Sequence, residues 1–464
     1  MADTINARGI FWWADAKVPP TNFAPDEAIA GSLTITDDGR ITIELDGVLP
    51  SPGGQFAIWD EPSPDRKIAG LLKAEHRYLL AVGVHSKGGV WSSNGISYDR
   101  FGAQFCLISD VMIPKQPKIR TVEFDLAGYE EWLRLGQVDR TKTSRNLTFK
   151  HRIKRKISYW HQTGYVVLER KLVANQHGYF GSRGTDLREI AKFRFTPRKS
   201  VGLDEAIRNY GLTHELMILL TGSEYQPDWP TVTLTTRQSC IAYFLKNRSE
   251  AKPPEWHESC IEFKDVENIL GEIFFNWISL RSDLGPGAYL YLATRRGLHL
   301  YQEHKFINLM WGLESLHRTI DGEGKSIEIE DRISRILHDI TDETDRKWLS
   351  KRTKFIGGTN LEDRLFGLFK SIPLEVDHRR LREFCKLCAK IRNDLSHHGH
   401  SNEAVDSGNS IQYLSVRSAI VSHLYHAILL HKIGLSNDVV KEWLTDRRGS
   451  SHFEWYLKKA GLKD

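Results

Sequence analysis

The first 262 residues alternate between short apolar segments and turn residues. Segments 33–36 and 41–45 place apolar side chains at every second position, with Asp37-Asp38-Gly39 between them. Because the side chains of a strand point alternately to its two faces, this pattern predicts two half-buried strands joined by a tight turn. Residues 204–220 instead follow a helical spacing, and Gly222 comes just after them, which predicts one helix among the strands. The other predicted strands are 78–84, 105–108, 121–126, 165–173 and 193–195.

After residue 262 the apolar spacing becomes helical. Residues three and four apart lie on one face of a helix, so each apolar stripe predicts a helix packed on its neighbours. The predicted helices are 266–280, 299–320, 330–339, 361–369, 381–398 and 411–433. We therefore predict an α+β multidomain protein, with a strand-rich domain over 1–262 and an all-α bundle within 263–464. By composition, Ala251-Lys252-Pro253-Pro254 is an equally good linker.

The helix predicted over 381–398 carries the chain's most distinctive chemistry. Its apolar stripe is formed by Leu381, Phe384, Cys388, Ile391 and Leu395. At about 100° per residue, Arg392 falls inside this stripe, where a guanidinium needs an anionic partner. Asn393 and His397 are four residues apart and share one face. Arg392 and His397 are about 140° apart on an ideal helix. They converge only if the helix frays or a second copy of the chain contributes. Gly399 and the polar residues 401–403 predict the end of the helix.

Each of these residues also has an ordinary structural interpretation. An arginine in an apolar seam often pairs with a buried carboxylate, and a histidine near a helix C-terminus interacts favourably with the helix dipole. His397, His398 and His400 are close enough in sequence to suggest a metal site. No cysteine or carboxylate set with ligand spacing accompanies them, so we predict no metal and no other cofactor.

Two further motifs extend the pattern around Arg392 into a family resemblance. The Arg-Asn-x-x-x-His motif is followed by a helix ending in residues 429–435, and residues 303–318 form an earlier long helix. Together they resemble the HEPN superfamily of helical ribonucleases. More closely, the whole chain resembles the ApeA family of bacterial anti-phage proteins, which have a β-rich N-terminal domain and a C-terminal HEPN domain. The N-terminal likeness rests on residues 9–13, 31–33 and 39–45.

This resemblance implies an endoribonuclease that acts in abortive-infection defence, with tRNA as its target. The HEPN core corresponds to about residues 299–445. The resemblance further implies a homodimer or higher homo-oligomer, with two motifs paired in one cleft. The β-rich domain is assigned sensing or restraint of the nuclease, with a phage-derived trigger as its partner.

The matched positions suggest roles in RNA cleavage. His397 is expected to act as general base on the ribose 2′-hydroxyl, and Arg392 to hold the phosphate. Asn393 is expected to orient His397 or to bind phosphate. Glu314 on the first long helix is the candidate partner of Arg392, with Asp394 as a second supporting residue. The general acid is left open, with His398 and His400 as candidate proton donors or RNA contacts.

Composition permits this function without requiring it. The chain has 464 residues and a formal net charge of +5, a mildly basic balance that suits a polyanionic partner. Five cysteines are few for this length, which favours a reducing cytoplasm over secretion. Cys385 and Cys388 lie near the buried stripe, so we interpret them as core residues. The chain has no signal-peptide pattern and no run of eighteen apolar residues, so we expect a soluble protein without a membrane-spanning segment.

Residues 142–156 form a basic segment that contains no acidic residue. Lys150, Arg152 and Lys154 are its candidate RNA contacts, with Tyr159 and Trp160 just beyond to stack on bases. The alternative is an edge strand guarded by lysines.

Two other classes of function stay open at this stage. The bundle could bind RNA or protein without cleaving, or it could support metal-dependent hydrolysis. Cleavage in the presence of EDTA separates both from a metal-independent ribonuclease.

Overall fold

The computed structural model divides into two compact units. The β-rich unit comprises Met1–His214 and Gln226–Glu250, and the helical unit comprises Glu215–Tyr225 and Ala251–Asp464. The predicted boundary at residue 262 lies twelve residues beyond the second division. The described residues are 3–20, 22–50, 66–73, 76–90, 92, 94–134, 138–143, 147–151, 156–179, 182–246, 251–295, 300–321, 327–353, 359–398, 407–445 and 452–464.

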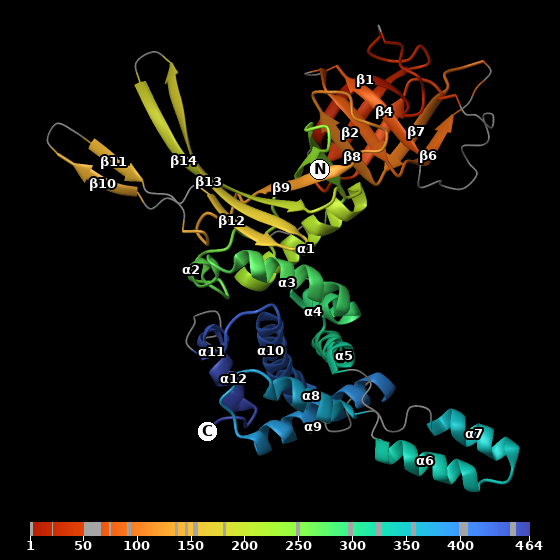
Figure 1. Cartoon of the computed structure of the whole chain (residues 1–464), viewed down its shortest axis with the longest axis vertical. Helices are drawn as coiled ribbons and strands as arrows, with labels where there is room; N and C mark the ends of the chain where they lie inside the picture. The colour runs from red at the N-terminus through yellow and green to blue at the C-terminus, as the bar shows by residue number, and fades with distance from the viewer. Residues whose placement is uncertain are drawn as a thin grey trace. The chain divides into compact units, whose positions relative to one another are not determined.

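The β-rich unit is built on one antiparallel sheet, in the order β12-β13-β14-β9-β15-β16-β8-β5-β4-β1-β2-β3-β7-β6 (Figure 1). A separate hairpin pairs β10 with β11. The strands are β1 (Asp3–Trp13), β2 (Ile29–Thr36), β3 (Ile41–Leu45), β4 (Lys67–Leu72), β5 (Tyr78–Val82), β6 (His85–Val90), β7 (Tyr98–Ala103), β8 (Phe105–Ser109), β9 (Ile119–Asp125), β10 (Val138–Lys142), β11 (Leu147–His151), β12 (Lys156–His161), β13 (Gly164–Tyr179), β14 (Ser182–Pro197), β15 (Thr231–Leu234) and β16 (Ser239–Phe244).

The β2–β3 hairpin confirms the alternation predicted from sequence. Leu33 and Ile35 of β2 and Ile43 of β3 are fully buried in the core of the sheet. Gly39 in the connecting turn has a φ of 84°, and a Cβ there would lie 1.9 Å from the Phe244 carbonyl oxygen. Only glycine fits this turn, because it tolerates both the left-handed backbone and the close approach.

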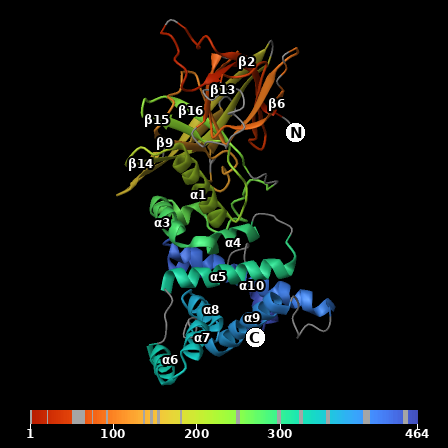
Figure 2. The ribbon, with the colours of Figure 1, turned by 90° about the vertical axis from the view of Figure 1, so that its right-hand side faces the viewer.

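The helical unit contains a bundle of packed helices. Helix α5 contacts α4, α8, α9 and α10, while α10 also contacts α11 and α12. Figure 2 shows α5 and α10 side by side, with α8 and α9 next to them. The helices of the chain are α1 (Leu203–Thr221), α2 (Phe263–Val266), α3 (Leu270–Asp283), α4 (Gly285–Arg295), α5 (Gln302–Asp321), α6 (Ile327–Asp339), α7 (Glu343–Thr353), α8 (Leu361–Lys370), α9 (His378–His398), α10 (Ser407–Lys432), α11 (Asn437–Thr445) and α12 (Phe453–Lys459). The predicted α+β organisation is confirmed.

Several elements differ from the prediction for identifiable reasons. The helix predicted over 266–280 is divided into α2 and α3. Helix α4 was not predicted because its first residues, Gly285-Pro286-Gly287, are typical of a turn, although proline is accepted in the first turn of a helix. Gly287 instead permits close packing, because a Cβ there would lie 2.7 Å from the Gly312 carbonyl of α5. Helix α7 was missed because none of its residues is buried.

Candidate functional site

Helices α5 and α9 meet through their apolar stripes. On α9 the buried residues include Leu381, Phe384, Cys388 and Ile391, and α5, which contacts α9, buries Leu313 and others. Asp377 starts α9 by accepting hydrogen bonds from the backbone N–H groups of residues 379 and 380, each at 3.0 Å. This capping holds the pKa of the Asp377 carboxyl below its usual range. The α5–α9 contact fixes the helix that carries the Arg-Asn-x-x-x-His motif.

An ion pair joins the motif to α5. Arg392 Nη2 lies 2.5 Å from Glu314 Oε2. The other carboxylate oxygen, Oε1, lies 2.8 Å from Arg318 Nη2, one turn further along α5. Glu314 therefore sits between two guanidinium groups and fixes the position of Arg392. The structure thus places Glu314 against Arg392 as the sequence predicted, while the part of this pair in cleavage stays a prediction.

Arg318 is a residue that the sequence reasoning missed. Its spacing of four residues from Glu314 is the ordinary signal of an ion pair on one helix face. Glu314 and Arg318 both lie in the segment 303–318 that carries the family resemblance, so the pair could have been found from the sequence.

The Arg392 guanidinium is restrained but remains accessible. Its side chain is 21% exposed, and Nη1 donates to Asn393 Oδ1 at 3.0 Å. Nε is buried and has no hydrogen-bond partner among the described residues. A guanidinium carries five N–H groups, so hydrogens remain on both Nη atoms after these two contacts. The Arg392 guanidinium can therefore donate further hydrogen bonds while Glu314 keeps it in place.

Helix α9 continues through the whole motif to His398. Fraying between Arg392 and His397 is thus not what brings the two residues together. Their separation of about 140° around the helix persists. Of the two alternatives raised by the sequence, contribution from a second copy is the one that this geometry supports.

The remaining predicted residues of the motif are placed as follows. Asn393 is exposed and bonds to Arg392, and Asp394 is partly buried. His397 and His398 belong to α9, but their side chains are not described, and His400 lies outside the described residues.

The basic segment is divided between the β10–β11 hairpin, the first residue of β12 and the undescribed part of the chain. Lys150 lies on β11, and its side chain is not described. Arg152 and Lys154 lie outside the described residues. Trp160 on β12 is exposed and lies against Tyr165, with ring centroids 4.7 Å apart.

The cysteine pair belongs to the core, as predicted. Cys385 and Cys388 are both fully buried and free. Burial raises the pKa of the Cys388 thiol to about 12 and that of Cys385 as well. Neutral buried thiols are poor metal ligands and poor nucleophiles.

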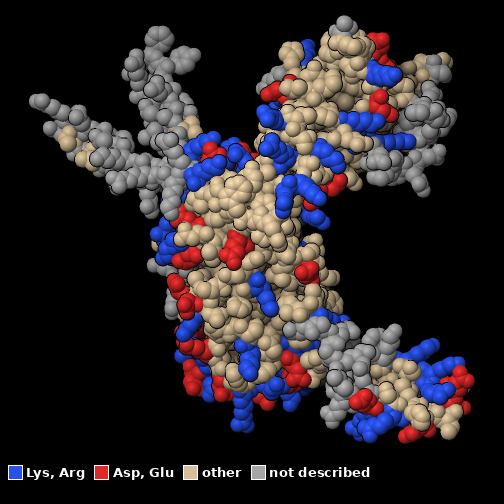
Figure 3. Space-filling view, viewed as in Figure 1, with Lys and Arg blue, Asp and Glu red and all other residues tan. Residues whose placement is uncertain are grey.

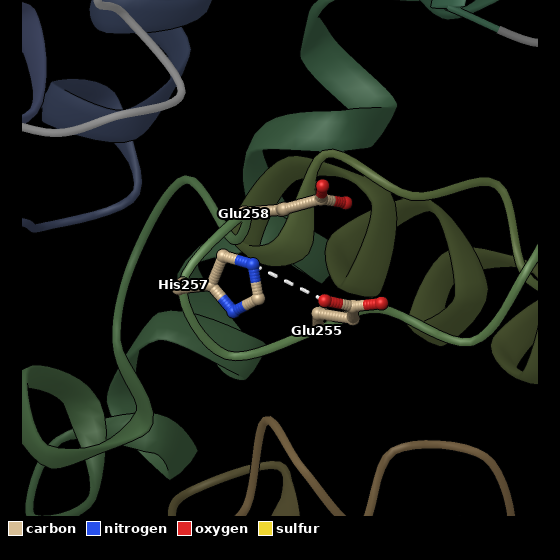
Figure 4. A group of neighbouring side chains, drawn as sticks. All are labelled: Glu255, His257 and Glu258. Carbon is tan, nitrogen blue, oxygen red and sulfur yellow. Dashed lines mark ion pairs between the residues drawn. The ribbon is translucent and has the colours of Figure 1, made fainter.

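Among the described residues, one group has side chains close enough to hold a metal ion. Glu255, His257 and Glu258 have potential ligand atoms within 4.8 Å of one another. Figure 4 shows the His257 ring turned towards Glu255, and its Nε2 lies 3.1 Å from Glu255 Oε2. Both carboxylates are exposed and one already pairs with the imidazole. We interpret this turn as a surface ion pair.

Comparisons with known proteins match both units. A family model described as ApeA N-terminal domain 1 matches residues 7–277. A second, described as Apea-like HEPN, matches residues 307–439 and so contains both Glu314 and the motif. No curated protein and no solved structure matches the chain. Within the described part of the chain, the helices are too short or too polar to cross a bilayer.

Proposed function

The chain belongs to the ApeA family, and from this membership and the Arg392 site we propose that it is a metal-independent endoribonuclease. Its HEPN domain supports a nuclease role or another RNA-related role. The observation that carries the finer proposal is Arg392, restrained by Glu314 and partly exposed at the end of α9. A planar, always-charged guanidinium recognises phosphate, as it does carboxylate, through hydrogen bonds in a fixed geometry.

The proposed chemistry begins at the ribose 2′-hydroxyl. His397 accepts the hydroxyl proton, and the 2′-oxygen forms a bond to the adjacent phosphorus. The bond from phosphorus to the 5′-oxygen then breaks, and that oxygen takes a proton from a general acid. The products are a 2′,3′-cyclic phosphate and a 5′-hydroxyl end. Arg392 stabilises the negative charge that develops on the phosphate oxygens.

We propose that the active site is composite and forms where two subunits meet. Arg392 and His397 diverge on the continuous helix α9, so a phosphate held by one subunit's Arg392 is best reached by the partner subunit's imidazole. Pairing two motifs also brings two imidazoles into one cleft. The general acid is a separate group, for which His398 and His400 are the candidates.

The biological proposal follows from the family. We propose that the enzyme cleaves tRNA in the bacterial cytoplasm as an abortive-infection response to phage. The β-rich unit would restrain the nuclease until a phage-derived trigger binds. Five free, buried cysteines agree with a reducing compartment.

The test is cleavage of end-labelled tRNA by the full chain in EDTA, with the new ends mapped chemically. Arg392→Ala and His397→Ala should each reduce cleavage by about 100-fold or more. Arg382→Ala is the matched control, because Arg382 Nη1 also crosses to another helix, pairing with Asp363 of α8 at 2.8 Å. The Arg382→Ala variant should cleave tRNA at the wild-type rate.

Three outcomes would refute the proposal. Equal cutting by all variants would remove Arg392 and His397 from the chemistry. Loss of cleavage in EDTA would show that the reaction depends on a metal ion. RNA binding without any product would instead support a non-catalytic binding protein.

A further inference from the structure

A charged groove runs along the N-terminal half of α9. It has a volume of about 790 Å³ and is bounded by α9, by Arg417 of α10 and by Ala460 and Gly461 after α12. Its charged lining comprises five cations and two carboxylates. The cations are Arg379, Arg380, Lys386, Lys390 and Arg417.

Arg417 is built into the groove wall. It is only 4% exposed, and its guanidinium lies over the Tyr413 ring, 3.2 Å from the ring centroid. Its Nη1 donates to the Tyr413 carbonyl oxygen at 3.3 Å. These contacts within α10 hold a buried positive charge against the groove. A fixed cation of this kind attracts an anion more strongly than a mobile surface lysine does.

The two carboxylates weaken the positive charge unequally. Asp377 already caps α9 through two backbone N–H groups. Glu383 lies on the exposed side of α9 between the cations. Figure 3 shows both signs of charge intermingled on the visible face of the helical unit. Five cations and two carboxylates line the groove, so the groove itself carries an excess of positive charge.

The groove lies on the same side of α9 as part of the motif. Positions 386, 390, 393 and 397 are separated by four, three and four residues, which is the spacing of one helix face. Lys386 and Lys390 are exposed on this face, as is Asn393. The distance along the axis from position 386 to 397 is about 16 Å. A strand held at the lysines can therefore continue to the motif.

We propose that this groove binds the phosphate backbone of the RNA and guides it along α9 to Asn393 and position 397. The proposal rests on the proposed ribonuclease function and names the surface that holds its substrate. Lys386, Lys390 and Arg417 contact phosphates without touching the reacting atoms. Their contribution appears in substrate binding rather than in the chemical step.

The test measures binding of fluorescently labelled tRNA by anisotropy over a range of salt concentrations. The full chain carries His397→Ala, so that RNA is not consumed. Lys386→Gln with Lys390→Gln should raise Kd about tenfold and reduce the salt dependence by about one counterion for each lysine. The control is Lys370→Gln with Lys432→Gln, which removes the same charge from exposed positions outside the groove. It should change Kd by less than about twofold.

Glu383→Gln provides a test in the opposite direction. Removing this carboxylate should tighten RNA binding by about two- to threefold, because it no longer opposes the neighbouring cations. A substitution that merely damaged the groove would weaken binding. A Glu383→Gln variant with weaker or unchanged binding therefore counts against the proposal.

Cleavage kinetics separate this inference from the function on which it rests. With His397 restored, the double lysine variant should raise KM and leave kcat near the wild-type value. If the wild type cleaves RNA but this variant has wild-type Kd and KM, the groove proposal fails and the ribonuclease proposal stands. If the variant loses RNA binding but the wild type makes no product, the ribonuclease proposal fails and the groove is an RNA-binding surface. If the wild type does not bind RNA, both fail.

Discussion

Among the described residues, the β-rich unit buries carboxylates, whereas the helical unit buries arginines as well as the carboxylate of Glu215. Among the described residues of the β-rich unit, the buried charged side chains are carboxylates, and they serve local structure. Asp99, for example, accepts the backbone N–H of Leu49 at 3.3 Å. Buried arginines occur only in the helical unit within the described part of the chain. They are Arg281, Arg364 and Arg417.

This difference indicates which unit is suited to meet RNA. Buried carboxylates stabilise loops by accepting backbone hydrogen bonds and would repel phosphate. Guanidinium groups held in or near a core can stabilise the fold through a carboxylate or bind an external anion. Arg281 does the first through Glu215, whereas Arg392 pairs with Glu314 and is also partly exposed, and we propose that it does both. Three variants or conditions should reveal this difference between the units, with expected effects that decrease in size.

The largest expected effect follows from removing the carboxylate that pairs with a fully buried arginine. Arg281 Nε lies 2.8 Å from Glu215 Oε2, and the two side chains are 4% and 8% exposed. Glu215→Ala leaves the guanidinium buried without this partner, so the free energy of unfolding should fall by about 3–5 kcal/mol. Chemical denaturation of the full chain measures this. Asp46→Ala in the β-rich unit is the control, because its partner Arg8 is exposed, and it should cause no measurable shift. Equal losses of unfolding free energy in the two variants would contradict this difference between the units.

The next effect is acid destabilisation of the helical unit. Burial lowers the pKa of His423 to about 4, and it also lowers the pKa of His426. Both imidazoles are neutral in the folded state, while in the unfolded state they bind protons below about pH 6.5. Their stabilisation is therefore complete above pH 6.5 and is lost as the pH falls from 6.5 towards 4. The loss should reach about 1.4 kcal/mol per pH unit for each histidine.

Unfolding followed by calorimetry between pH 7 and pH 4.5 tests this prediction. The transition of the helical unit should move to lower temperature more steeply than that of the β-rich unit, in which no described histidine is as fully buried as His426. His423→Gln should flatten the dependence. Parallel shifts of both transitions would argue against a special role for the buried imidazoles.

A smaller effect should follow from weakening the ion pair that holds Arg392 without removing Arg392 itself. Glu314→Gln preserves shape but removes the negative charge that holds Arg392. Because misplacing a catalytic group by about 1 Å can reduce rate 100-fold, cleavage should fall by about ten- to 100-fold. Arg318→Ala should have little effect, because Arg318 is 51% exposed and contacts the other oxygen of Glu314. If Glu314→Gln cut RNA as fast as the wild type, the ion pair would be structural only.

The local features of both units could be predicted from the sequence. The alternation of β2 and β3, the apolar stripe of α9 and the need for an anionic partner at Arg392 all follow from periodicity and the behaviour of buried charge. The choice of Glu314 depended on family resemblance, since residues 314 and 392 are far apart in the chain. Arg318 could have been found from its spacing to Glu314.

Features set by tertiary contact could not be predicted. The sheet pairs β9 with β15 and β14, and β5 with β8, and no local pattern fixes such an order. Helix α4 was hidden by its glycines and proline, of which Gly287 allows close packing against α5. The groove depends on Arg417, which comes to α9 from another helix. The four cations of α9 are visible in the sequence, but their meeting with Arg417 is not.

The most direct test of the central claim is complementation between two inactive variants. An Arg392→Ala subunit retains His397, and a His397→Ala subunit retains Arg392. In a symmetric dimer with composite sites, each mixed dimer contains one site with both groups and one with neither. Co-expression of the two variants in equal amounts should therefore restore about one quarter of wild-type RNA cleavage. Cleavage no higher than that of either variant alone would contradict a site shared between subunits.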